Sequence, residues 1–210
     1  MNRLGFSRPI ALALESPRIV EYPWVIRNMP STGKVLDVGS TGSQLALMLL
    51  ALGHEVWTID VRKYEYESVS NCLHCITGDI RSADFSPSFF DAVLVVSTIE
   101  HIGLGRYGDS IDAEGDINAM NEIRRILAPK GMLLITVPFG LQCTTRTHRV
   151  YDWKSLQFLL RGFEIEKAEF FLRLGLFWTR SSIEETKDVD SSRNERAIVC
   201  VSACNKCLAS

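Results

Sequence analysis

Short apolar runs alternate with longer amphipathic ones along this chain, the pattern of βαβ units that build a parallel sheet. Seven apolar runs predict strands, which cover residues 34–38, 55–60, 72–77, 92–97, 132–137, 163–172 and 196–203. Helical spacing predicts helices over residues 44–52, 117–127 and 153–161. Asp116 and Asp152 stand where the N-caps of the last two helices are expected. The pattern therefore predicts an α/β fold.

The two ends of the chain depart from this alternation. Four prolines fall within residues 1–30, so we expect this segment to wrap the body as short helices and turns. A polar stretch joins the last two predicted strands, which favours an antiparallel pair. With 210 residues and 46% hydrophobic content, the chain is long enough for one buried core. We expect a single domain over residues 1–210, with a ligand-binding half (31–138) and an acceptor-side half (139–210) after the wrapping segment.

Charge and hydropathy restrict the partners. Lysine and arginine number 23 against 25 aspartates and glutamates, and the net charge of −2 gives no field to attract nucleic acid. No uncharged apolar run approaches the roughly 20 residues of a membrane-spanning helix. The opening residues have no small-residue cleavage site after their short apolar stretch, so no signal peptide is predicted. We therefore expect a cytoplasmic protein without a nucleic-acid or membrane partner.

Six cysteines include two pairs with the two-residue gap of zinc sites, Cys72 with Cys75 and Cys204 with Cys207. The first pair lies in a predicted strand, where the two side chains point to opposite faces, and the second pair ends the chain. The sequence therefore favours reduced thiols and predicts no bound metal.

Acidic residues stand at the ends of the first three predicted strands, the edge at which open α/β sheets bind ligands. Asp37 precedes a glycine-bearing turn and a helix, a unit that offers backbone N–H groups to a polar ligand. The turn lacks the G-x-G-x-x-G spacing of dinucleotide sites, and a carboxylate at Asp37 would repel a pyrophosphate. A cationic ligand without phosphate fits better. S-adenosylmethionine (SAM), which carries an ammonium and a sulfonium, is such a ligand.

The next two acids fit the nucleoside of the same ligand. Asp60 ends the second strand, where an acid can accept both ribose hydroxyl hydrogens, as it also would for NAD. Asp79 follows the third strand, and together with Ile80 it can hold an adenine amino group and cover the ring. The three acids therefore predict SAM binding along one edge of the sheet.

The runs VLDVGS with Asp60, GDIRSADF, FDAVLVVSTIEHI and NEIRRILAPKGMLLITVP resemble, in this order, the motifs of class I SAM-dependent methyltransferases across residues 34–138. The resemblance implies a Rossmann-like seven-stranded, mostly parallel sheet with the last strand antiparallel and helices on both faces. It also implies that Asp37 and Gly39 face the methionine end of SAM and that Ser97 offers a backbone carbonyl. The implied cofactor contacts are Asp37, Gly39, Ser40, Gly42, Asp60, Val61, Asp79, Ile80 and Ser97.

Two further features bear on this resemblance. Thr41 and Ser43 stand where the family's turn has its second and third glycines, which leaves the path of the loop open. The runs EHIGLGRYGDSIDAEGD, VPFG and THRVYDW resemble a narrower methyltransferase subgroup that is associated with surface-polysaccharide and glycan gene clusters. That second resemblance implies a sugar or glycan precursor as the methyl acceptor.

Catalytic groups are expected in the loops after the fourth and fifth strands, which would lie over the methyl group of a bound SAM. His101 is the first candidate for a general base, and Glu100 and His148 are further candidates. A purely structural role for His101, with its nitrogens satisfied, is an equal alternative. The long loop over residues 103–116 is predicted to cover the acceptor, and its acids miss the calcium-loop template. The expected acceptor contacts are Arg106, Tyr107, Arg149 and Tyr151.

The predicted activity is SAM-dependent methylation of a hydroxyl on a small molecule, in particular a sugar or glycan precursor. One alternative is a non-catalytic SAM-binding protein that acts as a sensor or partner subunit. Others are an N-methyltransferase of a small amine and a nicotinamide oxidoreductase, against which Asp37 argues. The sequence leaves a homodimer open.

Overall fold

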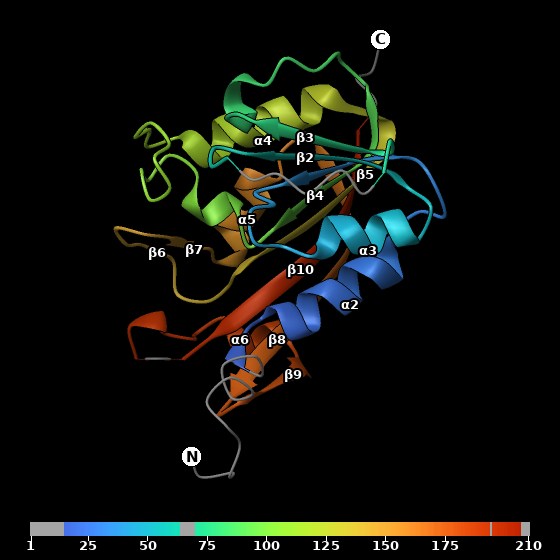
Figure 1. The fold of residues 1–210 in the computed structure, drawn as a ribbon. Helices are drawn as coiled ribbons and strands as arrows, with labels where there is room; N and C mark the ends of the chain where they lie inside the picture. Colours follow the sequence, from blue (N-terminus) through green and yellow to red (C-terminus); the bar gives the residue numbers. More distant parts are fainter. Residues whose placement is uncertain (1–14, 64–69, 194, 207–210) are drawn as a thin grey trace.

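A computed structural model describes residues 15–63, 70–193 and 195–206. Its centre is an eight-stranded sheet with the strand order β3-β2-β1-β4-β5-β10-β8-β9 (Figure 1). The first five strands in this order run parallel to one another. They are β3 (Leu73–Thr77), β2 (Glu55–Asp60), β1 (Lys34–Val38), β4 (Phe90–Val96) and β5 (Leu127–Pro138). Their carboxyl ends therefore share one edge of the sheet.

The remaining strands extend the sheet in antiparallel pairs. β10 (Ala197–Asn205) lies antiparallel between β5 and β8 (Phe163–Leu174), as predicted for the last two strands. β9 (Phe177–Ser181) then pairs antiparallel with β8 at the edge of the sheet. The expected count of seven strands is wrong by this one strand: residues 177–181 lie in the connection between the last two predicted strands, and only the last two of them belong to its polar stretch. No residue of β9 is fully buried, because the strand lies at the edge of the sheet.

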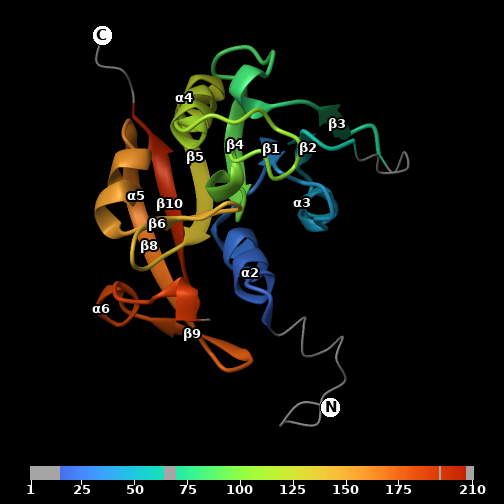
Figure 2. The same cartoon turned by 90° about the vertical axis from the view of Figure 1, so that its left-hand side faces the viewer.

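Helices cover both faces of the sheet, as predicted (Figure 2). α2 (Arg18–Asn28) and α3 (Leu45–Ala51) pack on one face, where Trp24 and Leu49 join a buried apolar cluster with β1 and β4. α4 (Gly115–Ile126) and α5 (Trp153–Leu159) pack on the other, where Ile123 and Leu156 join the larger cluster. The observed layers are those of a Rossmann-like fold.

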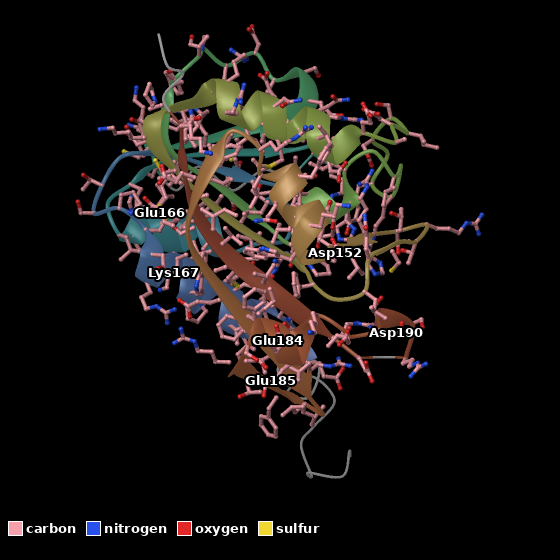
Figure 3. The ribbon with its side chains drawn as sticks, turned by 180° about the vertical axis from the view of Figure 1, so that it is seen from behind. Asp152, Glu166, Lys167, Glu184, Glu185 and Asp190 are labelled. Carbon is pink, nitrogen blue, oxygen red and sulfur yellow. The ribbon has the colours of Figure 1, made fainter. Side chains whose placement is uncertain are left out.

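Two predicted helix caps have different outcomes. Asp152, labelled in Figure 3, caps α5 as predicted. It accepts a hydrogen bond from the backbone N–H of Ser155, whose side chain accepts from the backbone of Asp152 in return. The cap assigned to Asp116 is wrong, because α4 begins at Gly115 after Glu114. The Asp116 side chain instead turns into the protein.

The other elements are short. They are the 3₁₀ turns η1 (Ile80–Ser82), η2 (Ile99–His101) and η3 (Ser191–Arg193), the strand pair β6 (Cys143–Thr144) and β7 (Arg149–Val150), and α6 (Ile183–Thr186). Of the wrapping segment, residues 15–30 are described and form mainly the single helix α2; residues 1–14 lie outside the described part. Among the helices in that part, none is long and apolar enough to cross a membrane.

Candidate functional site

A cleft with a cavity volume of about 160 Å³ opens at the carboxyl ends of β1, β2 and β4. The sequence-predicted residues that line it are Gly39, Asp60, Val61, Asp79, Ile80, Ser97, His101 and Tyr107. The structure thus brings the expected cofactor edge and the first expected catalytic residue together in one cavity.

The turn between β1 and α3 forms one wall of the cleft. Gly39 has φ of +78°, and a Cβ atom there would stand 2.4 Å from the methyl carbon of Thr98, so only glycine fits. Gly42 also has φ of +78° but has open space around it. Ser40 is buried, whereas Thr41 lines the cleft and donates its backbone N–H to Asp60. The loop keeps a path along the cleft although Thr41 replaces the glycine expected there.

Asp60, at the end of β2, is held by four donors. Its Oδ1 accepts hydrogen bonds from the backbone N–H and the Nε of Arg62, at 2.9 and 3.1 Å. Its Oδ2 accepts from the backbone N–H of Thr41 and the Nη2 of Arg62, both at 3.0 Å. Burial alone would raise the pKa of Asp60, but the hydrogen bonds from Arg62 outweigh it and hold the pKa below its usual range. Asp60 is therefore ionised and fully paired.

Asp79 repeats this arrangement at the end of β3. Arg81 donates to it from its backbone N–H, its Nε and its Nη2, the last at 2.6 Å. These bonds outweigh burial and hold the pKa of Asp79 below its usual range. Arg81 also reaches Ser110 and Asp112 of the long loop and is only 10% exposed, so it ties the loop to this edge.

Asp37, in contrast, is buried and has an oxygen that no donor satisfies among the described residues. It is 3% exposed, and its Oδ2 has no hydrogen-bond partner in the described part of the chain. Burial raises its pKa to about 7, and the nearby charge of Asp60 adds to the rise while Arg18 opposes it. Asp37 does not itself line the cleft but directly precedes Val38 and Gly39, which do. Its carboxyl group is held where a cation would stabilise the ionised form.

Glu100 and His101 follow β4 in the turn η2. His101 lines the cleft, and its Nδ1 donates to the backbone carbonyl of Thr147 at 2.5 Å, which leaves the lone pair on Nε2. Burial lowers the pKa of His101 to about 4. Glu100 lies behind it, 2% exposed, with its Oε1 3.7 Å from His101 Nε2 and no partner for its Oε2 among the described residues. Burial raises the pKa of Glu100 to about 8.

The first turns of α2 complete the cleft on the side of β4. Arg18 lines it and donates from Nη1 to Glu21 at 2.7 Å and to the carbonyl of Val96 at 3.0 Å. Glu21 is fully buried and accepts from the side chains of Ser97, at 2.5 Å, and Thr136, at 2.7 Å. Ser97 has φ of +43°, a strained value for a residue other than glycine, and Glu21 helps to hold it there.

The long loop reaches the mouth of the cleft through Tyr107. The Tyr107 ring stacks on the guanidinium groups of Arg62, at 4.2 Å, and Arg106, at 5.1 Å. Asp109 accepts hydrogen bonds from three backbone N–H groups of this loop, so it shapes the loop. Arg106 contacts His101 and the Thr147 carbonyl but does not line the cleft.

Three other predicted residues lie away from the cavity. His148 does not line it, although its ring lies 6.4 Å from that of His101. Tyr151 and Arg149 are buried and both reach Asp116: the Tyr151 hydroxyl donates to it at 2.8 Å and Arg149 Nε lies 3.5 Å from it. Arg149 also donates to the carbonyl of Ile102. The structure therefore places Arg149 and Tyr151 as supports of the loop and of α4, not on the cavity wall.

Sequence reasoning missed several residues that line the cleft, chiefly Arg18, Arg62, Thr98 and Asp109. One signal for Arg62 was present, because the tripeptides Asp-Val-Arg and Asp-Ile-Arg recur at residues 60–62 and 79–81. Nothing in the sequence pattern connects Arg18 with β4, because helix α2 is far from that strand along the chain.

Comparisons with solved structures agree on the fold. A SAM-dependent methyltransferase from Methanosarcina mazei superposes with a TM-score of 0.62 at 15% identity over 89% of this chain and 99% of the other. The Burkholderia thailandensis 1,6-didemethyltoxoflavin-N1-methyltransferase, solved with its substrate and S-adenosylhomocysteine, gives 0.66 at 15% identity over 92% and 80%. The 4+2 cyclase SpnF gives 0.64 at 16% identity over 88% and 79%. At such identities the likeness establishes the fold, which is the one predicted.

No curated protein matches the chain. A family model described as "Caenorhabditis protein of unknown function, DUF268" matches residues 34–172, more than half of the chain, and the chain therefore belongs to this family.

Proposed function

We propose that the cleft binds SAM and that the protein transfers its methyl group to a hydroxyl of a small molecule, in particular a sugar or glycan precursor. The observation that carries the proposal is the buried Asp37, whose Oδ2 has no partner among the described residues, directly before the wall residues Val38 and Gly39 of a cleft that the ionised Asp60 and Asp79 also line. Such a cleft matches a ligand with a neutral nucleoside and a cationic amino-acid tail. SAM has both parts.

The residues present fit this ligand. Asp60 and Asp79 offer carboxylate oxygens to ribose and adenine, and the apolar Val61 and Ile80 lie beside them on the cleft wall. The missing Cβ of Gly39 keeps space open at the end of β1. The Methanosarcina mazei and Burkholderia thailandensis proteins, which share the fold, are a SAM-dependent methyltransferase and a methyltransferase solved with S-adenosylhomocysteine. These likenesses support the proposal.

The other end of the cleft is suited to the amino-acid tail. Asp37 would pair with the ammonium, and the strained backbone of Ser97 would offer its carbonyl. Arg18 has further donors beyond the Nη1 that binds Glu21, and a carboxylate can accept from them. Burial makes each of these charge-assisted bonds stronger than it would be in water.

His101 is the proposed general base. When bound, SAM would supply an electrophilic methyl group to the acceptor oxygen, with S-adenosylhomocysteine as the leaving group. Because Nδ1 of His101 is committed to the Thr147 carbonyl, Nε2 is the nitrogen that accepts the hydroxyl proton. Glu100, with its Oε1 3.7 Å from Nε2, stabilises the protonated ring when it is itself ionised. Since the pKa of Glu100 is about 8, we expect the rate to rise toward that pH.

A specific observation favours a second candidate, a SAM-binding protein without catalysis. The pKa of His101, about 4, makes its ring a weak proton acceptor.

One experiment separates the two candidates. Tritiated methyl transfer from SAM is measured on a panel of sugars, sugar nucleotides and glycans, with S-adenosylhomocysteine binding measured in parallel by calorimetry. His101→Ala should bind S-adenosylhomocysteine like the wild type and lose about 100-fold to 10,000-fold in rate. Undiminished activity of this variant would remove His101 from catalysis. Binding without transfer to any acceptor would favour the non-catalytic candidate.

We further propose that residues 1–210 form a single domain, that the protein is cytoplasmic and that it acts in glycan biosynthesis. The thiols of Cys72, Cys75 and Cys143, which are exposed and form no disulfide, support a reducing compartment. A homodimer stays a prediction.

A further inference from the structure

The same tripeptide pattern ends two neighbouring strands, with Asp60-Val61-Arg62 after β2 and Asp79-Ile80-Arg81 after β3. In each, the arginine binds the aspartate two residues before it through both its backbone N–H and its guanidinium group. The two arginines differ in their surroundings. Arg81 is 10% exposed and is also bonded to the loop at Ser110, whereas Arg62 is 37% exposed and lines the cleft.

The hydrogen bonds to Asp60 leave no acceptor site for a ribose. A carboxylate offers about four lone-pair sites, and Asp60 receives four donors. Two of these are backbone N–H groups of Thr41 and Arg62, whose positions are fixed by the chain. The other two come from the Arg62 side chain, which can rotate away. A ribose that binds Asp60 must therefore replace the Arg62 guanidinium.

The displaced guanidinium can remain on the ring of Tyr107. It already stacks on Tyr107, and Arg106 stacks on the same ring, so two cations would lie at this ring once Arg62 loses its carboxylate. Arginine stays charged at every relevant pH, so the positive charge released at the mouth of the cleft persists. Arginine pairs well with planar carboxylates and with phosphates.

We propose that Arg62 occupies the ribose site until the cofactor displaces it, and that the displaced side chain then binds an anionic group, a carboxylate or a phosphate, on the acceptor. This inference rests on the proposed function and names a substrate class for the same site. It makes binding ordered, because the anion site forms only after the nucleoside is bound.

The first test measures competition at Asp60 by calorimetry with adenosine and S-adenosylhomocysteine. Arg62→Met keeps the apolar stem and removes the charge, and we expect it to tighten both ligands three- to tenfold. Lysine cannot form the two-pronged bond to Asp60, so the affinity of Arg62→Lys should lie between those of the wild type and Arg62→Met. Arg125→Met is the matched control and should not tighten either ligand, because it removes a similarly exposed arginine from Glu122 outside the cleft. Thermal melting checks that each variant is folded.

Equal or weaker binding of both ligands by Arg62→Met would overturn the inference while leaving SAM binding in place. Failure of both the wild type and Arg62→Met to bind S-adenosylhomocysteine would overturn the proposed function itself. Binding by Arg62→Met alone would support the inference most strongly.

The second test uses inorganic phosphate and acetate as probes, with glycerol as the uncharged control, at constant ionic strength. Protein saturated with S-adenosylhomocysteine should bind one of the anions at least tenfold more tightly than ligand-free protein does, and Arg62→Met should lose this gain. The two anions distinguish a phosphorylated acceptor from a carboxylated one. Equal anion binding with and without S-adenosylhomocysteine, or in the wild type and Arg62→Met, would overturn the anion site.

Discussion

The two ends of the cleft hold carboxyl groups in opposite states. At the nucleoside end, Asp60 and Asp79 are paired with arginines and their pKa values lie below the usual range. Behind the wall at the other end, Asp37 and Glu100 are buried and do not line the cleft. Each has an oxygen without a partner among the described residues, and burial raises their pKa values to about 7 and about 8. The carboxylates at the nucleoside end are thus paired within the protein, whereas the carboxyl groups at the other end would be paired only by a bound cation.

The two ends therefore contribute differently to ligand binding and to the stability of the ligand-free protein. A paired carboxylate stabilises the ligand-free protein and must exchange partners to bind a ligand, so the bonds that it gives up offset part of what it gains on binding. An unpartnered buried carboxyl destabilises the ligand-free protein when it ionises and gains strongly when a cation arrives. We therefore expect the nucleoside end to determine which ligand is recognised and the other end to make binding depend on charge.

The largest expected effect tests the nucleoside end. Asp60→Ala removes the acceptor of both ribose hydroxyls, each worth about 1 to 3 kcal/mol if left unpaired, so S-adenosylhomocysteine affinity should fall about 100-fold or more. Calorimetry checks this, with Asp91→Ala as a control on a carboxylate that caps the start of β1 and lies outside the cleft. Unchanged affinity in Asp60→Ala would end the ribose assignment.

The comparison predicts different pH dependence for two ligands. Adenosine touches only the nucleoside end, where Asp60 and Asp79 stay ionised, so its affinity should be flat between pH 6 and 8. S-adenosylhomocysteine brings an ammonium to Asp37, whose pKa of about 7 must fall on binding, so protons are released and affinity rises with pH. We expect about a tenfold rise from pH 6 to 8. His101, with its pKa of about 4, does not titrate in this range.

Calorimetry at several pH values, in buffers of different ionisation enthalpy, measures both the affinity and the released protons. Asp37→Asn is the matched control and should remove most of the slope. If the affinity for adenosine rose with pH as steeply as that for S-adenosylhomocysteine, the proposed difference between the two ends would be wrong.

The smallest expected effect is on the ligand-free protein. Because the pKa of Asp37 is raised on folding, its contribution to stability is fully present below the unfolded-state pKa and is lost as pH rises through about 7. Asp37→Asn should therefore stabilise the protein more at pH 9 than at pH 5, by about 1 to 3 kcal/mol. Asp60→Asn should instead change stability by about the same amount at both pH values, because the lowered pKa of Asp60 keeps it ionised at pH 5 and at pH 9. Chemical denaturation at the two pH values measures both variants, and an effect of Asp37→Asn that is equal at pH 5 and 9 would contradict the burial argument.

The sequence predicted the central strands best. The bounds of β1 and β2 agree with the predicted ranges, because parallel strands buried on both faces form continuous apolar runs. β9 was missed because it lies at the sheet edge and is largely exposed. Asp116 was mistaken for a helix cap because its contact with Tyr151 joins residues far apart in the sequence.

The candidate site was predicted unevenly for a related reason. Strand-end acids are visible in the sequence, since the ends of parallel strands must meet at one edge. The hydrogen-bond partners of buried acids cannot be predicted in this way, because many of them lie far away in the sequence. The hydrogen bonds that Ser97 and Thr136 donate to Glu21 span 76 and 115 residues, and no local sequence pattern predicts them. Arg62 was overlooked because a charged residue after a strand is ordinarily a solvated one.

The most direct test of SAM binding in this cleft is a crystal structure of the wild-type protein with S-adenosylhomocysteine at pH 8. We predict the ribose hydroxyls on Asp60, the ammonium beside Asp37 and the Arg62 guanidinium away from Asp60. A cleft that stays empty at saturating ligand, with Arg62 still bound to Asp60, would contradict the account.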